Sequence, residues 1–237
     1  MKSHLKYFDS YEKLSKEVAA HTLSKISESE SLHIGVATGN SPRMAYEFIG
    51  KALNENPILI PKLRIFQLDE WLGLSPQNPS SCQQYLFEHI IRPWNLEVDQ
   101  YFLLDGQHPN MGSQLKEMRM YLDKNSLDLC ILGMGKNGHL AFNEPGSRKA
   151  DTCRMVSLAK ASKNHQMVEG LDVTLEKGIT IGLKEIMVSK ELLLIVSGEG
   201  KQEARQKLLG KAPISKFTAS VVNGHANYSI YLQEAPD

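Results

Sequence analysis

The sequence LDLCILGMGKNGHLAFNEPG, at residues 127–146, decides the fold. Its first part, residues 127–132, is almost continuously apolar and ends at a glycine, which is typical of a strand buried on both faces of a parallel sheet. The glycine-rich remainder predicts a loop that carries His139 and Glu144. Ligands bind beyond the carboxyl ends of strands in open α/β sheets. This loop is therefore the first candidate for a functional site.

Two simpler interpretations compete with a catalytic loop. Gly133, Gly135 and Gly138 match the glycine pattern of dinucleotide-binding folds, which requires an immediate helix and an acidic residue about 20 residues further on. Pro145 interrupts any such helix, and no apolar run ends in Asp or Glu at that distance, so a nicotinamide or flavin site is disfavoured. In the second interpretation, the histidine and the glutamate only stabilise the loop.

Short apolar runs alternate with stretches of helical periodicity along the rest of the chain. Strands are expected at residues 32–37, 63–68, 101–104, 179–183, 191–196, 219–222 and 228–232. Helices are expected at residues 11–29, 42–53, 82–94, 113–122, 183–189 and 201–209. No linker or repeat divides residues 1–237. The pattern predicts a single α/β domain of the doubly wound, Rossmann-like type, with a mostly parallel sheet and helices on both faces.

Charge and composition exclude several classes of partner. Lys and Arg number 27, as do Asp and Glu, so the net charge of zero disfavours a nucleic-acid or membrane surface. Cys82, Cys130 and Cys153 are widely spaced and form no C-x-x-C pair, which favours reduced thiols over disulfides or a zinc site. No leader and no apolar stretch of membrane-spanning length is apparent. A cytoplasmic location is expected.

A second candidate site lies in the turn after residues 32–37. Thr38, Gly39, Asn40 and Ser41 precede Pro42, which suits the first turn of a helix. Backbone N–H groups and hydroxyls at a helix N-terminus form a cradle for phosphate. An ordinary strand-to-helix turn is the simpler interpretation of such a short motif.

The strand at residues 63–68 delivers Asp69 and Glu70 at its carboxyl end. Adjacent side chains on an extended chain point in opposite directions, so only one of these carboxylates can face a crevice. Further on, the polar segment 148–177 is a candidate lid, in which Lys163 and His165 are candidate contacts for substrate or phosphate.

Five motifs, in order along nearly the whole chain, resemble those of the glucosamine-6-phosphate deaminase (isomerising) family and its galactosamine-6-phosphate counterpart. They are ATGNSP at 37–42, QLDEW at 67–71, LGMGKNGHLAFNEPG at 132–146, GITIGLKEI at 178–186 and SGEGKQEA at 197–204. The resemblance implies a 2-amino-2-deoxyhexose 6-phosphate as substrate, with no metal and no cofactor. It also implies an isomerase that acts as a hydrolase in releasing ammonia.

The resemblance implies roles for several positions. Asp69 would move a proton between C2 and C1, and His139 would open the sugar ring with Glu144 orienting its imidazole. Asn137 stands where many members have aspartate and is expected to orient the histidine. The phosphate-binding positions implied are Thr38, Gly39, Asn40, Ser41 and Lys201, with Gly133 and Gly135 also at the substrate. The family's phosphate-binding arginine has no counterpart in register, which leaves Lys163 or His165 as replacements.

The sequence is compatible with four interpretations of the activity. Trp71 and the surrounding motifs look most like galactosamine-6-phosphate isomerase, which yields tagatose 6-phosphate. The alternatives are glucosamine-6-phosphate deamination to fructose 6-phosphate, a 6-phosphogluconolactonase, and a non-catalytic sugar-phosphate sensor. The lactonase pattern lacks the Asn143–Pro145 sequence, and sensors add a DNA-binding segment. A monomer or small homo-oligomer is expected.

Overall fold

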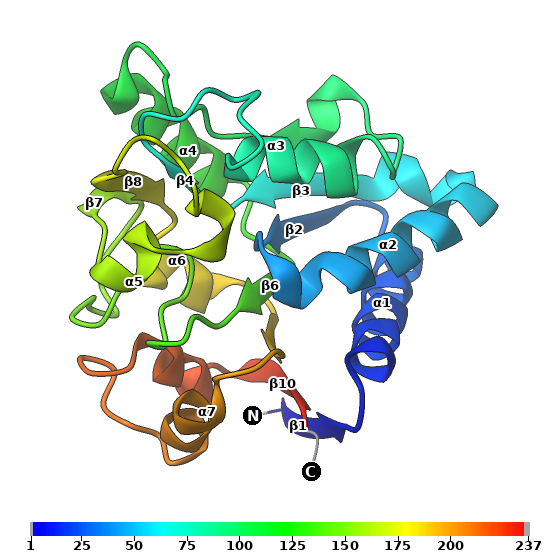
Figure 1. The fold of residues 1–237 in the computed structure, drawn as a ribbon. Helices are drawn as coiled ribbons and strands as arrows, with labels where there is room; N and C mark the ends of the chain where they lie inside the picture. The colour runs from blue at the N-terminus through cyan, green and yellow to red at the C-terminus, as the bar shows by residue number, and fades with distance from the viewer. Residues whose placement is uncertain (1, 235–237) are drawn as a thin grey trace.

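A seven-stranded parallel sheet forms the centre of the computed structural model, which describes residues 2–234 (Figure 1). In spatial order its strands are β1 (Lys2–Phe8), β10 (Asn227–Gln233), β9 (Leu192–Val196), β6 (Leu129–Gly133), β2 (Leu32–Val36), β3 (Leu63–Gln67) and β5 (Tyr101–Phe102). The central strands β6 and β9 are buried on both sides, because helices cover both faces of the sheet. The predicted fold class is confirmed.

Alternate residues of β6 face two separate hydrophobic clusters. Leu129 and Ile131 pack into one cluster, and Cys130 and Leu132 pack into the other. The first cluster is covered by α1 (Tyr11–Glu28), α2 (Asn40–Glu55), α3 (Cys82–Leu86) and the π-helix η2 (Phe87–Ile91). The second is covered by α4 (Met111–Lys124), α6 (Leu183–Val188), α7 (Gln202–Leu209) and the 3₁₀ helix η5 (Thr218–Gly224). Short 3₁₀ helices η1 (Pro57–Lys62) and η3 (Val98–Gln100) complete the connections.

A second, three-stranded antiparallel sheet lies beside the first. It consists of β4 (Asp69–Trp71), β8 (Lys177–Thr180) and β7 (Arg154–Ser157). The segment expected to form a lid supplies β7 and the start of β8, with α5 (Lys160–Lys163) and η4 (Gln166–Val168) between them. Together with β4 it builds a third, smaller hydrophobic cluster around Trp71.

The expected elements differ from the structure at three places. Residues 219–222 form part of a 3₁₀ helix, not a strand, so that prediction was wrong. The strand expected at residues 179–183 is β8, which ends at Thr180 and belongs to the small sheet, and Leu183 begins α6. The edge strand β1 was not expected at all. In contrast, residues 134–153, all described, contain no helix after β6, which agrees with the argument against a dinucleotide fold. Within residues 2–234, no helix is long and apolar enough to cross a membrane.

Candidate active site

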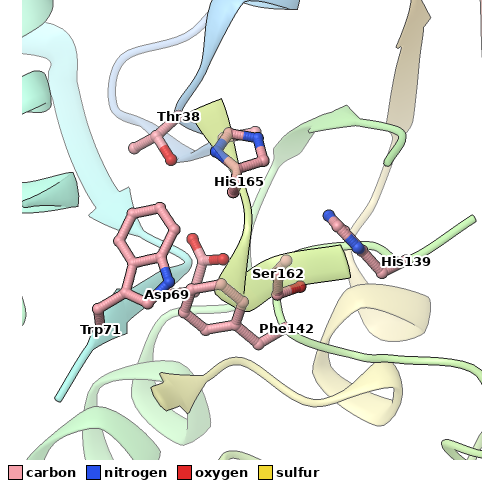
Figure 2. Close-up of a pocket in the computed structure, with 9 residues that line it drawn as sticks. Thr38, Asp69, Trp71, His139, Phe142, Ser162 and His165 are labelled. Carbon is pink, nitrogen blue, oxygen red and sulfur yellow. The ribbon is translucent and has the colours of Figure 1, made fainter. Parts of the chain in front are cut away.

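A pocket opens where the carboxyl ends of β2, β3 and β6 meet the segment that follows β7. It encloses about 420 Å³, part of it open to solvent. It is lined by Ala37, Thr38, Asp69, Trp71, His139, Ala141, Phe142, Ser162 and His165 (Figure 2). The pocket therefore gathers residues from four separate parts of the chain at the edge of the sheet where ligands bind.

Asp69 is the acidic group of the pocket. It is the first residue of β4, directly beyond the end of β3, and its carboxylate faces the cavity in Figure 2. The side chain is only 7% exposed. Burial first, and then the negative charges of Glu70 and Glu144, raise the pKa of Asp69 to about 8. A carboxyl group poised near neutrality can both take and give a proton.

Glu70 is turned away from the pocket and holds the start of α3. Its carboxylate accepts hydrogen bonds from the Ser81 hydroxyl at 2.9 Å and from the backbone N–H groups of Cys82 at 3.1 Å and Gln83 at 2.8 Å. It is fully buried. Glu70 is therefore an anchoring carboxylate, as its position beside Asp69 on an extended chain predicts.

The loop after β6 places an imidazole next to a carboxylate. His139 Nδ1 lies 3.6 Å from Glu144 Oε2, and among residues 2–234 this nitrogen has no hydrogen-bond partner. Asn137 links the two residues, since its Nδ2 donates to Glu144 Oε2 at 2.9 Å and its Oδ1 accepts from the backbone N–H of His139 at 3.1 Å. Burial alone would raise the pKa of Glu144, but its polar neighbours, His139 foremost, hold it below the ordinary value. Glu144 is thus an ionised partner for the histidine.

Gly135 allows the histidine to lie against the loop backbone. A Cβ at this position would come within 2.4 Å of His139 Cε1, so any side chain would displace the ring. Gly138 has φ of +82°, and a Cβ there would collide with Phe217 at 2.3 Å. Two of the glycines noted in the sequence therefore serve the placement of His139.

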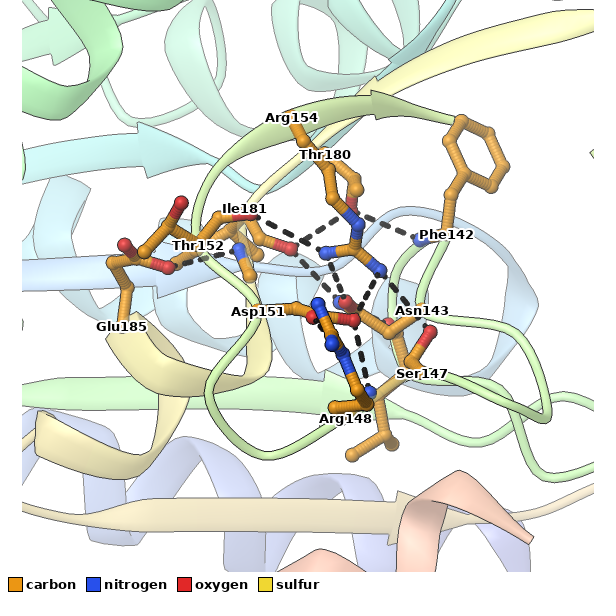
Figure 3. Close-up of polar contacts among 12 residues, drawn as sticks. Phe142, Asn143, Ser147, Arg148, Asp151, Thr152, Arg154, Thr180, Ile181 and Glu185 are labelled. Carbon is orange, nitrogen blue, oxygen red and sulfur yellow. Dashed lines mark hydrogen bonds and ion pairs between the residues drawn. The ribbon is translucent and has the colours of Figure 1, made fainter. Parts of the chain in front are cut away.

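The rear of the loop is held by Arg154 on β7 (Figure 3). Its guanidinium donates to Asn143 Oδ1 at 2.9 Å and to Ser147 Oγ at 3.1 Å. Asn143 is fully buried and also donates to the carbonyl of Ile181 at 2.8 Å. Because Asn143 precedes Glu144, these contacts fix the position of the carboxylate without lining the pocket.

The turn at residues 38–41 lies on the other side of the pocket. Gly39 has φ of +98° and precedes α2, which begins at Asn40. Ser41 Oγ accepts a hydrogen bond from Lys201 Nζ at 3.3 Å. Burial, followed by the positive charges of Arg205 and Lys136, lowers the pKa of Lys201 to about 8. Hydroxyls, a helix N-terminus and an ammonium group therefore meet here, as a phosphate cradle requires.

Residues 148–177, the covering segment, contribute two side chains to the pocket. Ser162 donates to Glu144 Oε1, and His165 packs on Trp71 with ring centroids 6.0 Å apart. His165 Nδ1 accepts from the Met167 N–H at 3.2 Å. Burial, then the charges of His139 and Lys201, lowers the pKa of His165 to about 4. The neutral ring therefore keeps its proton on Nε2, as a hydrogen-bond donor.

Lys163, the other candidate from this segment, is paired with Glu176 and does not line the pocket. The sequence also gave no sign of Phe142 and Ser162 as lining residues, because their types are ordinary and the path of the chain decides their position. Gly133 lies near the cradle, since a Cβ there would be 4.0 Å from Ser41 Cβ. Within residues 2–234, no cluster of three or more His, Cys, Asp or Glu side chains could hold a metal ion.

The fold and the pocket define an α/β protein with acid–base side chains beside a turn suited to anions. The chain belongs to the family described as glucosamine-6-phosphate isomerases/6-phosphogluconolactonase, whose sequence profile matches residues 9–230.

Relatives of known name span almost the whole chain. The putative deaminase AgaI of Escherichia coli (strain K12) is 32% identical over 224 residues, covering 94% of this chain and 89% of that protein. Glucosamine-6-phosphate deaminase 2 of Bacillus subtilis (strain 168) is 32% identical over 225 residues, covering 93% and 90%. A solved monomeric glucosamine-6-phosphate deaminase superposes with a TM-score of 0.91 at 28% identity, covering 99% of this chain and 98% of that one. A 6-phosphogluconolactonase from Thermotoga maritima has a TM-score of 0.78 at 15% identity, covering 98% and 100%, and so shares the fold.

Proposed function

We propose that this protein isomerises and deaminates a 2-amino-2-deoxyhexose 6-phosphate. The observation that carries the proposal is the pairing, across one pocket, of Asp69 with its raised pKa and the His139–Glu144 pair. Such a reaction requires two separate proton transfers, one at a ring oxygen and one at carbon. The relatives named as deaminases support the same reaction class. Isomerisation with loss of ammonia describes it better than the broader hydrolase label.

The chemistry divides between the two sides of the pocket. His139 passes a proton from the O1 hydroxyl to the ring oxygen O5, which opens the pyranose to the aldehyde. Ionised Glu144 stabilises the imidazolium that forms in between. Asp69 then removes the C2 proton and returns it to C1, while O1 gains a proton and the amine nitrogen gives one up, so that the C2 amine becomes an imine and the C1 aldehyde becomes an alcohol. Water hydrolyses the imine to a ketone and ammonia.

This sequence of steps uses only side chains of the protein. The cradle at residues 38–41, with Lys201, holds the phosphate and fixes C1 and C2 between Asp69 and His139. Orienting two reacting groups in this way supplies much of the rate gain in such reactions. Turnover is therefore expected without added cofactor and in excess chelator. Loss of activity on chelation would contradict the proposal.

We propose galactosamine 6-phosphate as the preferred substrate, giving tagatose 6-phosphate. The motifs around Trp71 support this choice. Trp71 is 2% exposed, and its ring meets Phe142 at 5.1 Å between centroids, so the pair forms a rigid pocket wall. The two epimers differ only in the C4 hydroxyl. A buried hydrogen-bonding group left unpaired by one epimer costs ~1–3 kcal/mol, which corresponds to a difference of about 5- to 150-fold in kcat/KM between the two epimers.

The test is to compare kcat/KM for purified galactosamine 6-phosphate and glucosamine 6-phosphate by ammonia release. A preference for the galacto epimer is expected. A clear preference for the gluco epimer would contradict the proposed substrate but leave the proposed reaction unchanged. Acid release from 6-phosphogluconolactone with no ammonia from either amino sugar would identify a lactonase instead. Binding of an amino sugar phosphate without any turnover would identify a sensor.

A further inference from the structure

Three cationic side chains gather at the phosphate cradle without an anionic partner. Lys201 contacts Ser41, and the charges of Arg205 and Lys136 both act on it. Other cations of the described residues, such as Lys163 and Lys190, are paired with carboxylates. Within residues 2–234, none of the three cradle cations forms an ion pair with a carboxylate.

The three cations come from the loop after β6 and from the start of α7, where Lys201 contacts Ser41. Lys136 belongs to the loop after β6, and its Nζ lies 3.5 Å from the position that a Cβ on Gly200 would occupy. Gly200 has φ of +71° and directly precedes Lys201. This left-handed backbone favours glycine, and a Cβ there would make an ordinary van der Waals contact with Lys136, so the Lys136 ammonium lies beside the residue that precedes Lys201.

Arg205 lies one turn of helix beyond Lys201, and its N–H donates to the Lys201 carbonyl at 2.8 Å. The guanidinium Nε is buried and has no hydrogen-bond partner in the described residues. A buried, unpaired charged donor is costly, and so are like charges held close together. Both costs fall when a dianion occupies the space between them.

We propose that Lys136 and Arg205 join Lys201 and Ser41 in holding the phosphate of the substrate. The covering segment supplies no cation of its own to the pocket, because Lys163 is paired with Glu176. A phosphate monoester with a second pKa near 6 is mostly dianionic at neutral pH and can accept from several donors at once. That this phosphate belongs to a sugar rests on the proposed function, whereas the binding of a phosphate dianion does not.

The test is isothermal titration of the whole protein with inorganic phosphate and with tagatose 6-phosphate at fixed ionic strength. Lys136→Gln and Arg205→Gln are each expected to raise the Kd for both ligands about tenfold, the usual effect of losing one charge-assisted hydrogen bond. Lys184→Gln removes an exposed lysine from α6, which lines a different hollow, and is the matched control with unchanged Kd. In turnover assays, KM should rise and kcat should stay within about twofold.

A pH series separates a charge effect from a structural one. Lys201 is faced by Lys136, Arg205 and, across the pocket, His165. Because neighbouring cations favour the neutral amine, removing either of the first two raises the pKa of Lys201. The alkaline loss of phosphate binding should therefore move to higher pH in Lys136→Gln and Arg205→Gln, and stay in place in the control.

Each result decides between the proposals. The role of Lys136 and Arg205 would be overturned if the folded variants kept the wild-type Kd values and lost phosphate binding at the same alkaline pH as the wild type. This would hold even if the wild-type protein deaminates its substrate. Weaker phosphate binding in both variants, with no amino sugar turned over by the wild type, would support the phosphate site and refute the proposed reaction.

Discussion

Asp69 and Glu70 are adjacent carboxylates with different surroundings. Glu70 accepts several hydrogen bonds around the start of α3, whereas Asp69 faces the pocket and gains none that would favour its ionised form. Sequence alone predicts that the two side chains diverge. The raised pKa of Asp69 depends first on its burial and then on the charges of Glu70 and Glu144, and neither the burial nor the approach of the distant Glu144 is apparent from the sequence.

Asp69→Asn should remove nearly all turnover while leaving substrate affinity almost unchanged. The amide fills the same space but cannot carry the proton between C2 and C1. A loss of about 10²- to 10⁴-fold in kcat is expected for removal of a general base. The measurements are kcat and the Kd of tagatose 6-phosphate. Asp99→Asn, at an exposed position, is the matched control, and survival of turnover in Asp69→Asn would assign the base to another group.

The same substitution should change stability in a pH-dependent way. Because the pKa of Asp69 is raised from 3.8 to about 8 by folding, its contribution to stability is greatest below pH 3.8 and is lost as the pH rises through 8. Asn cannot ionise, so the variant does not lose stability in this way as the pH rises. The Tm of Asp69→Asn should therefore exceed that of the wild type at pH 8.5, by about 2–4 °C per kcal/mol gained, and the gain should shrink towards pH 5. An equal Tm difference at both pH values would contradict the burial of an ionisable Asp69.

At the scale of elements, buried strands were predictable and exposed or short ones were not. Strands β6 and β9 are continuous apolar runs, β2 and β3 are mostly apolar, and all four were predicted from the sequence. The edge strand β1 leaves Leu5 and Tyr7 about half exposed, so its apolar pattern is weak. Strand β4 has three residues and is defined by its partner β8, far along the chain. Residues 219–222 are apolar enough for a strand but are buried as a 3₁₀ helix.

The same distinction applies to the site. Asp69, His139 and Glu144 were located because each follows a recognisable strand or lies in a recognisable motif. Ser162 could not be located, because α5 reaches the pocket only through the pairing of β7 with β8.

Arg154 connects the small sheet to the loop that carries Glu144. Arg154→Gln should lower the free energy of unfolding by about 1–3 kcal/mol, because it leaves buried Asn143 without a donor for its Oδ1. The kcat should also fall, since Glu144 is the next residue. Urea unfolding and steady-state kinetics measure the two effects. Arg148→Gln is the control, because that side chain is 83% exposed; equal losses in both variants would refute the role assigned to Arg154.

For the whole molecule, we expect a monomer or small oligomer with hyperbolic kinetics. The acid–base groups and the cradle are brought together within one copy of the chain. A monomeric relative superposes over nearly the full length. Light scattering together with substrate saturation curves checks this expectation. A hexamer with sigmoidal curves, relieved by N-acetylglucosamine 6-phosphate, would contradict it.

The position of β10 between β1 and β9 affects the order in which the central sheet can assemble during translation. During synthesis residues 2–8 emerge more than two hundred residues before their sheet neighbour, residues 227–233. Until then β1 has no partner, and its backbone and its apolar Leu5 and Tyr7 remain available to chaperones and proteases. The central sheet can therefore close only after residues 227–233 have been translated, so β1, which precedes the other strands of this sheet in the sequence, is among the last of them to pair.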